Sequence, residues 1–368
     1  MKKKQKSDLR SLTIEQKIAL IEQIYIWSPA LKEMIDLINR CREFSKIAAE
    51  PKSILITGEQ GAGKTKLIER YMENFPRAVT AKETIVPVLA VDVINPATVK
   101  SLVEELLDAL GDPAADKGTI ASQTRRLCNL LKKCKTELII MDEFQHLIDW
   151  KSSKVMQNIS NWLKVVMNRT KLPIVLIGMP NSADILDTKG NEQLKRRFSA
   201  RRRLEPFGWG ESEDEQADMT GFLENLDEAL AQVLPKRSGL DDPETAYLIH
   251  SATGGAVHKI MKLVRGAAGM DLNQGLKKID LVLLEEAYDE YLFEEETYEE
   301  HPAEGGSGGE DRQQRVNPFH LAATGQKLPR RKKSSRKAER RGAGDRAMGK
   351  RVRASKKGPS VSEILRRQ

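Results

Sequence analysis

The chemistry most clearly encoded in this chain lies in residues 58–65, which read Gly-Glu-Gln-Gly-Ala-Gly-Lys-Thr. This is a complete G-x-x-x-x-G-K-[ST] phosphate-binding loop, in which glycines let backbone N–H groups face phosphates, the lysine supplies a cation and the threonine hydroxyl binds Mg²⁺. An apolar run at 53–57 precedes the loop, and a helix predicted to begin at Lys66 follows it. The N-terminal dipole of that helix favours the same anions. The residues predicted to contact the nucleotide are Gly58, Glu59, Gln60, Gly61, Ala62, Gly63, Lys64, Thr65 and Lys66.

A second motif, residues 137–143, is a short apolar run that ends in two carboxylates. A buried parallel strand would deliver these acids to the carboxyl edge of a sheet, as in a Walker B element. We expect Asp142 to hold Mg²⁺ together with Thr65, and Glu143 to polarise the attacking water while Lys64 stabilises the phosphates. The two acids could instead begin a helix at Phe144, and both interpretations can hold together. The pair of motifs predicts an ATPase that uses ATP and Mg²⁺.

The elements that must position these motifs alternate along the chain. Apolar runs predict strands at 86–93, 137–143 and 172–178, and helical periodicity predicts helices at 96–110, 118–134 and from after Trp150 to Asn168. Strands joined by crossover helices indicate an α/β fold with a parallel sheet flanked by helices. A helical region, Asp241 to Met270, follows this core.

Composition divides the chain electrostatically. The net charge is +8, but residues 327–368 hold 17 Lys or Arg against 3 acids, so the body before them is mildly acidic. A segment this basic and poor in apolar residues is predicted to be disordered and to contact nucleic acid or an acidic partner. Near its end, Val361, Ile364 and Leu365 would share one helical face and form a short docking motif, or belong to an ordinary solvated tail.

We therefore expect five regions. They are an N-terminal helical extension at 1–50, the nucleotide-binding core at 51–210, a helical lid at 211–300, a flexible linker at 301–326 and the basic tail at 327–368. The sequence contains no apolar run near the roughly 18 residues that span a bilayer, and its three cysteines lack zinc or disulfide spacing. A cytoplasmic bacterial protein with no membrane partner is expected.

Two further features are typical of an AAA+ module. The strand at 172–178 is followed by Met179-Pro180-Asn181-Ser182, where a sensor 1 side chain meets the γ-phosphate; Met179 is apolar, so Asn181 or Ser182 would take that role. The segment 193–198 resembles a box that carries an arginine finger, for which Arg197 is the first candidate and Arg196 the second.

In the expected helical lid, the sensor 2 arginine of AAA+ proteins is matched by His258 or Lys259. A histidine contacting phosphate would make nucleotide binding depend on pH near neutrality, although His258 could equally be structural. Tyr25 and Trp27, predicted to lie in an N-terminal helix, could pack near the adenine or form plain core.

The set of motifs resembles the TniB and TnsC ATPases of transposons, AAA+ regulators related to MuB. The resemblance covers about residues 10–270 and rests on four segments, namely Ile24-Tyr25-Ile26-Trp27-Ser28-Pro29-Ala30, residues 106–113, Asp142-Glu143-Phe144-Gln145-His146-Leu147 and residues 172–178. It implies an ATP-dependent homo-oligomer, a ring or helical filament, that coats duplex DNA. It also implies that the protein receives a signal from a target-selection protein or RNA-guided complex and recruits a transposase.

DNA contacts are harder to place. A spiral oligomer needs only a few cations per subunit, because phosphate contacts add along a filament. The candidates, which could also be ordinary solvated helix residues, are Lys100, Gln123, Arg125 and Arg126. Two other functions remain open: an AAA+ loader or initiator-like ATPase of replication or repair, and a STAND-type signalling ATPase without a DNA role.

Overall fold

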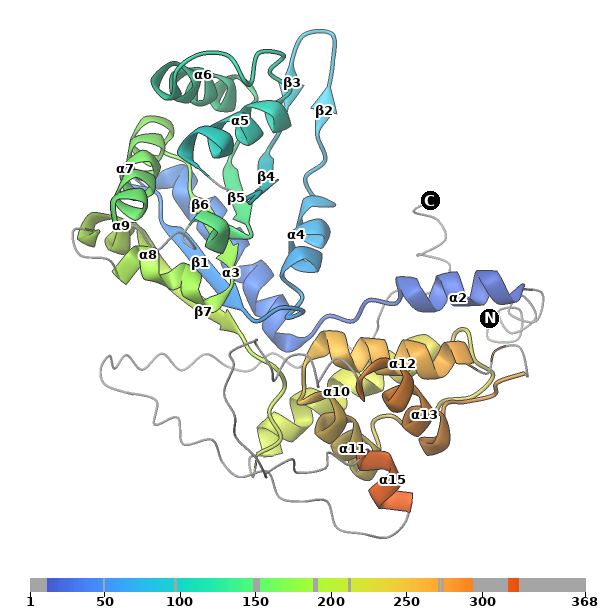
Figure 1. Cartoon of the computed structure of the whole chain (residues 1–368). Helices are drawn as coiled ribbons and strands as arrows, with labels where there is room; N and C mark the ends of the chain where they lie inside the picture. Colours follow the sequence, from blue (N-terminus) through green and yellow to red (C-terminus); the bar gives the residue numbers. More distant parts are fainter. Residues whose placement is uncertain are drawn as a thin grey trace, which may run out of the picture. The chain divides into compact units, whose positions relative to one another are not determined.

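The computed structural model describes residues 12–48, 50–95, 98–147, 153–187, 191–210, 213–270, 272, 275–293 and 317–323 (Figure 1). The chain divides into two compact units, which are taken separately below. A sheet unit comprises Trp27–Phe207 with Ala256–His258. A helical unit comprises Met1–Ile26, Gly208–Gly255 and Lys259–Gln368. The first boundary between the two units falls after Ile26, within the predicted N-terminal extension.

The sheet unit is built on five parallel strands in the order β4-β5-β6-β1-β7. The strands are β1 (Ser53–Gly58), β4 (Val88–Asp92), β5 (Leu138–Asp142), β6 (Ile174–Gly178) and β7 (Phe198–Leu204). Every residue of β1, β5 and β6 is buried, which accounts for their continuous apolar sequences. A short antiparallel pair, β2 (Ala78–Val79) and β3 (Thr84–Ile85), precedes β4.

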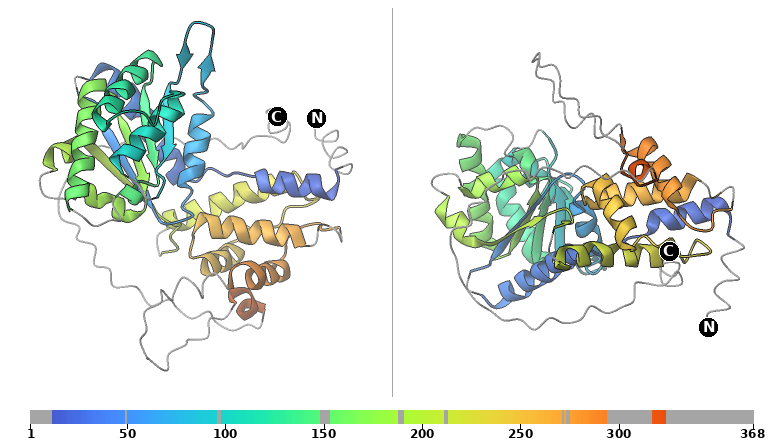
Figure 2. Two further views of the ribbon diagram at one scale, coloured as in Figure 1. Left: turned by 45° about the horizontal axis from the view of Figure 1, so that its top comes forward. Right: turned by 90° about the horizontal axis from the view of Figure 1, so that it is seen from below.

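Helices flank this sheet, and Figure 2 shows them from two further directions. They are α3 (Pro29–Ile47), α4 (Lys64–Met72), α5 (Val99–Leu110), α6 (Ile120–Lys133), α7 (Ser153–Thr170), α8 (Asp184–Asp187) and α9 (Glu192–Arg197), with 3₁₀ turns η1 (Phe144–Leu147) and η2 (Pro180–Ala183). The apolar face predicted for α5 packs into the main core with Trp162 and Leu163 of α7. Thr98 caps the start of α5, so this helix begins after the predicted Pro96, which itself lies outside the described residues.

The helical unit contains α2 (Ile14–Gln23), α10 (Glu213–Leu230), α11 (Pro243–Thr253), most of α12 (Val257–Met270), α13 (Leu281–Tyr291) and α15 (Pro318–Ala323). Asp227 of α10 is fully buried and accepts hydrogen bonds from the backbone N–H groups of Ser238 and Gly239, both at 2.8 Å. Arg237 lies 3.3 Å from the same carboxylate. These bonds fix the turn that connects α10 to α11.

Two predictions about local structure are wrong. Tyr25 and Trp27 do not lie in a helix, because α2 ends at Gln23 and Ser28 caps the start of α3. Residues 317–323, predicted to be flexible linker, contain α15, in which Phe319 is 1% exposed and the Asn317 amide donates to Glu285 O and Asp289 Oδ1. The rest of the predicted linker and the whole basic tail lie outside the described residues. No helix in the described part of the chain has the length and apolar character needed to cross a membrane.

Candidate functional site

The phosphate-binding loop connects the buried strand β1 to α4, as its sequence predicts. Gly61 and Gly63 have φ values of +73° and +91°, a left-handed backbone that a residue with a Cβ adopts only with strain. Gly63 is the residue before the first turn of α4. The loop therefore directs the N-terminus of α4 toward the place where phosphates would bind.

Lys64 is 6% exposed, and its ammonium group is held within the loop. It donates to the carbonyl oxygens of Gly58 and Glu59, both at 2.9 Å. The sulfur of Met179, at the end of β6, lies 4.0 Å from the same nitrogen. A buried lysine at the helix start supplies the cation required by the predicted role.

Thr65 and Asp142 connect the loop to the end of β5. The Thr65 hydroxyl donates to Asp142 Oδ2 at 3.2 Å, while the N–H of Glu143 donates to Asp142 Oδ1 at 2.9 Å. Asp142 is 1% exposed, and burial raises its carboxyl pKa above the ordinary value. A hydroxyl and a carboxylate side by side are hard oxygen donors of the kind that Mg²⁺ prefers, so these two residues fit the metal role predicted for them.

Glu143 follows directly and has a φ of +53°, unusual for a residue with a side chain. Its carboxylate accepts a hydrogen bond from the Gln145 amide, and His146 Nε2 lies 3.8 Å from the same oxygen. The 3₁₀ turn η1 carries Gln145 and His146. Asp142 is therefore the last residue of β5, and Glu143 directly precedes a short helical turn.

The end of β6 lies beside this turn. The Met179 N–H donates to Gln145 Oε1 at 3.0 Å. The two candidates for sensor 1 differ in accessibility, since Asn181 is exposed while Ser182 is fully buried beside Gly178. Of the two, Asn181 alone has a side chain with surface available to a ligand.

The two candidate arginine fingers lie at the end of α9. Arg197 Nη2 donates to Asn168 Oδ1 of α7 at 2.5 Å, and Arg196 is exposed. Within the same subunit, neither makes a described contact with the phosphate-binding loop. Arg203 of β7 does reach the loop, pairing with Glu59 at 2.9 Å.

The candidates for sensor 2 differ in their placement. A methyl group added to Gly61 would lie 2.2 Å from His258 Nδ1, so the imidazole of His258 lies directly against the phosphate-binding loop. Lys259 belongs to the helical unit and is 9% exposed. The sequence motif identified His258 as a candidate. Its contact with Gly61 depends on the tertiary fold, which no local sequence pattern reveals.

Two of the four candidate DNA-binding residues form hydrogen bonds within the fold. Gln123 is fully buried, and its amide donates to Glu104 Oε1 at 3.0 Å and Ala115 O at 2.8 Å, so its side chain has no surface for DNA. Arg126 bonds to Asp112 and to the carbonyl oxygens of Ala114 and Lys117, and it thereby holds the α5–α6 loop. Arg125 and Lys100 are exposed, the latter 3.5 Å from Glu104.

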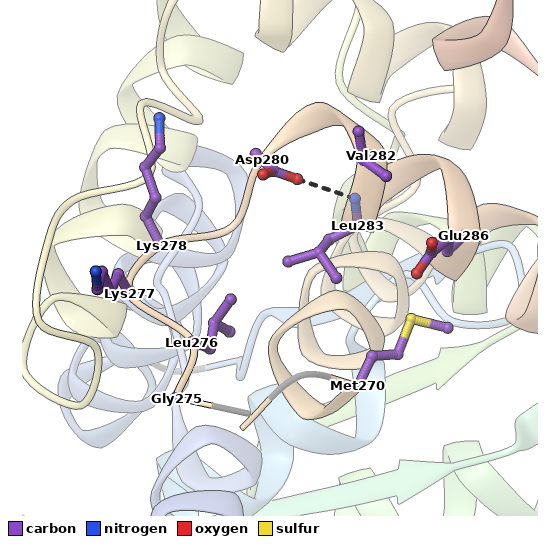
Figure 3. A pocket seen from close by; sticks show the side chains of 9 residues that line it. All are labelled: Met270, Gly275, Leu276, Lys277, Lys278, Asp280, Val282, Leu283 and Glu286. Atoms are coloured by element: carbon purple, nitrogen blue, oxygen red, sulfur yellow. Dashed lines mark hydrogen bonds between the residues drawn. The ribbon is translucent and has the colours of Figure 1, made fainter. Parts of the chain in front are cut away.

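A cavity of about 600 Å³ lies in the helical unit, between the end of α12 and α13 (Figure 3). Its lining includes two lysines, Lys277 and Lys278, and two acids, Asp280 and Glu286. Asp280 accepts a hydrogen bond from Leu283 N–H at 3.1 Å and caps α13. The lining thus carries equal numbers of basic and acidic side chains.

Solved structures with a similar fold include ORC and Cdc6p proteins. Residues of this chain superimpose on Aeropyrum pernix ORC2 in ADPNP-ADP complexes with a TM-score of 0.52 and 16% identity, over 74% of this chain and 71% of that one. Cdc6p from Pyrobaculum aerophilum gives 0.54 and 14%, over 75% and 71%. Drosophila ORC bound to DNA gives 0.50 and 13%, over 76% and 66%. These similarities show that the fold is that of AAA+ ATPases.

A comparison with curated proteins found no match. The model of the family described as bacterial TniB protein matches residues 17–208, which is more than half of the chain. That range contains the phosphate-binding loop, the Walker B acids, the end of β6 and both candidate arginine fingers. The chain therefore belongs to the bacterial TniB protein family and has an AAA+ fold.

Proposed function

We propose that this protein is an ATP-hydrolysing, DNA-binding oligomeric regulator of transposition, in which hydrolysis controls assembly on target DNA. One observation carries the enzymatic part. The Thr65–Asp142 hydrogen bond brings the phosphate-binding loop and the end of β5 into one site, with Lys64 and Glu143 beside it. This arrangement contains a cation for the phosphates, oxygen donors for a metal and a carboxylate for the water.

The proposed reaction follows from these side chains. Loop N–H groups and the ammonium of Lys64 hold the β- and γ-phosphates, and Glu143 orients a water in line with the bond between the γ-phosphorus and the bridging oxygen. As the water oxygen bonds to phosphorus, Glu143 takes up its proton and the bridging bond breaks, giving ADP and inorganic phosphate. Thr65 and Asp142 would hold Mg²⁺, which neutralises charge on the phosphate oxygens when bound.

The role in transposition is supported by membership of the TniB family. DNA binding is supported by the basic segment 327–368 and by exposed Lys100 and Arg125. The partners proposed are duplex DNA, a transposase, a target-selection protein or RNA-guided complex, and further copies of the same chain. An initiator-like role in replication or repair is a second candidate, because the similar solved structures include ORC bound to DNA.

Electron microscopy with duplex DNA tests the proposal. With ATP or a non-hydrolysed analogue, the wild-type protein should form rings or helical filaments on DNA, and with ADP it should not. Lys64→Ala should lose ATP binding and with it the assemblies, because the loop then lacks its cation. Lys46 is an exposed lysine that pairs with Glu43 on the same helix. Lys46→Ala therefore offers a matched control.

The outcomes separate the alternatives. Tight ATP binding by Lys64→Ala would contradict the assignment of the loop. Nucleotide-dependent DNA binding without any stimulation of a transposase encoded beside this chain would favour the initiator-like role. ATP hydrolysis with no DNA binding at all would favour a signalling ATPase of the STAND type.

A further inference from the structure

Gln145 uses both ends of its side-chain amide in the nucleotide site, a role that its sequence position did not suggest. It is 7% exposed and lies in η1, two residues after Glu143. Its oxygen accepts the Met179 N–H at 3.0 Å, and its nitrogen donates to Glu143 Oε2. The amide thus connects the end of β6 to the carboxylate proposed to polarise water.

The orientation of this amide is determined by its partners. A backbone N–H can only donate, so the oxygen of Gln145 must face Met179, and the NH₂ group must then face the acceptor Glu143. Space around it is restricted as well. A methyl group added to Gly178 would lie 2.6 Å from Gln145 Oε1 and 3.2 Å from Phe144 N.

Met179 also contacts the phosphate-binding lysine, since its sulfur lies 4.0 Å from Lys64 Nζ. The same residue therefore contacts Lys64 through its side chain and Gln145 through its backbone. We propose that Gln145 is a positioning residue that couples occupancy of the phosphate site to the orientation of the Glu143 carboxylate. This inference rests on the proposed ATP hydrolysis.

The arrangement also explains how an apolar residue can stand at position 179. A phosphate that displaces Lys64 or Met179 moves the backbone N–H of Met179, and Gln145 transmits the movement to Glu143 through one hydrogen bond at each end. The polar function expected of a side chain at the end of β6 is then performed by a backbone group and by the amide from the neighbouring turn.

Steady-state ATPase kinetics test the inference in the full-length protein. Gln145→Ala should lower kcat about tenfold or more, and the loss should not exceed the roughly 10²- to 10⁴-fold that a general base contributes. KM and the affinity for a fluorescent ATP analogue should stay within about twofold of the wild-type values. Gln145→Glu keeps an acceptor for Met179 N–H but places a carboxylate against Glu143, so its kcat should fall at least as far. Gln157→Ala, at a glutamine of α7 that bonds to Asn161, is the matched control and should behave as wild type.

A double variant distinguishes positioning from a separate structural effect. Because Gln145 acts through Glu143, adding Gln145→Ala to Glu143→Gln should change the residual rate less than twofold. Wild-type kcat in Gln145→Ala, or a full additional loss in the Glu143→Gln background, would overturn the inference while leaving the proposed ATPase intact. If the wild-type protein hydrolyses no ATP with any DNA, the proposed function and this inference both fall.

Discussion

Asp142 is a carboxylate that the folded protein buries at the end of β5. Burial raises its pKa above the ordinary value, and the hydrogen bonds from Glu143 N–H and Thr65 lower it in part. Because the pKa of Asp142 is raised in the folded state, the contribution of this group to folding stability is fully present at low pH, where the carboxyl is neutral. That contribution is lost as the pH rises through the folded-state pKa. Ionisation of the Asp142 carboxylate therefore lowers the stability of the nucleotide-free protein.

Asp142→Asn should consequently raise the melting temperature of the nucleotide-free protein at pH 7 by about 1–3 °C. The amide can still accept the Glu143 N–H and donate to the Thr65 hydroxyl, so the fold keeps its contacts. The difference from wild type should shrink as the pH falls into the range where Asp142 becomes protonated. Differential scanning fluorimetry across pH measures both effects.

The same variant should lose the stabilisation that Mg²⁺ with ATP gives to wild type, because the metal then lacks its charged ligand. Asp108→Asn is the control, since Asp108 is an exposed acid on α5. A melting temperature of Asp142→Asn below that of wild type would show that the ionised carboxylate stabilises the fold.

At this scale, local pattern predicted Lys64, Thr65 and Asp142 because a single loop and a single strand end determine what these residues do. Gln145 was not predicted, since its proposed positioning role depends on Met179, a residue 34 positions away that follows the strand next to β5. The contact between His258 and Gly61 is hidden from sequence for the same reason. Residues within a recognisable motif could be predicted from the sequence, whereas contacts between a motif and a residue outside any motif could not.

Among the elements, α6 shows how a helix divides its polar residues between structure and surface. Gln123 and Arg126 hold the α5–α6 loop, and Arg125 between them is exposed. Sequence alone could not separate the three, because the partners of Gln123 and Arg126 come from a loop whose path is set by tertiary packing.

Replacing Lys100 and Arg125 together by Glu should weaken duplex DNA binding about tenfold or more and reduce its dependence on salt, because phosphate contacts release counterions. Fluorescence anisotropy over a range of salt concentrations measures both quantities. Lys132→Glu with Lys133→Glu makes the same change of charge at exposed positions at the end of α6 and should have a smaller effect. Equal losses in the two double variants would point to net charge and not to specific contacts.

The strands β1, β5 and β6 and the helix α5 were predictable because these strands are buried on both faces and α5 has a continuous apolar face. The predictions of secondary structure were wrong where tertiary contacts or helix caps, and not local composition, determine the structure. The helix α15 forms in the expected linker because the Asn317 amide bonds to α13, about thirty residues earlier, and Phe319 is buried. Tyr25 and Trp27 interrupt a helical pattern because Ser28 and Pro29 start a new helix.

For the whole assembly, an arginine finger acts on the neighbouring subunit, so its function appears only in the oligomer. Arg197→Ala should hydrolyse ATP poorly alone, yet it should recover part of the activity when mixed with Lys64→Ala subunits that donate an intact Arg197. Titrating one variant into the other at constant total protein measures the recovery. Normal co-assembly without recovery would assign Arg197 to structure, in keeping with its bond to Asn168, and would direct attention to Arg196.

The basic tail is expected to serve recruitment and not catalysis. Deleting residues 328–368 should leave ATP binding within about twofold, because every proposed ligand of ATP precedes residue 260, but it should impair insertion of DNA in a reconstituted reaction with the transposase. Replacing Val361, Ile364 and Leu365 by Ser should abolish recruitment while leaving DNA affinity nearly unchanged.

A shuffled tail of the same composition separates charge from docking. If the tail only holds DNA by charge, the shuffled protein should be fully active and its DNA binding should fall steeply with salt. Full insertion activity of the truncated protein would remove the recruitment role.

β7 is the last strand in the order of the sheet and carries Arg201, Arg202 and Arg203 in succession. Their side chains are between 33% and 46% exposed. A strand at the edge of a sheet presents unpaired backbone N–H and C=O groups. A strand from another molecule can form hydrogen bonds with these groups, which is the first step of aggregation. An incoming strand would have to desolvate three guanidinium groups, so the arginine row protects concentrated protein from cross-molecular sheet growth.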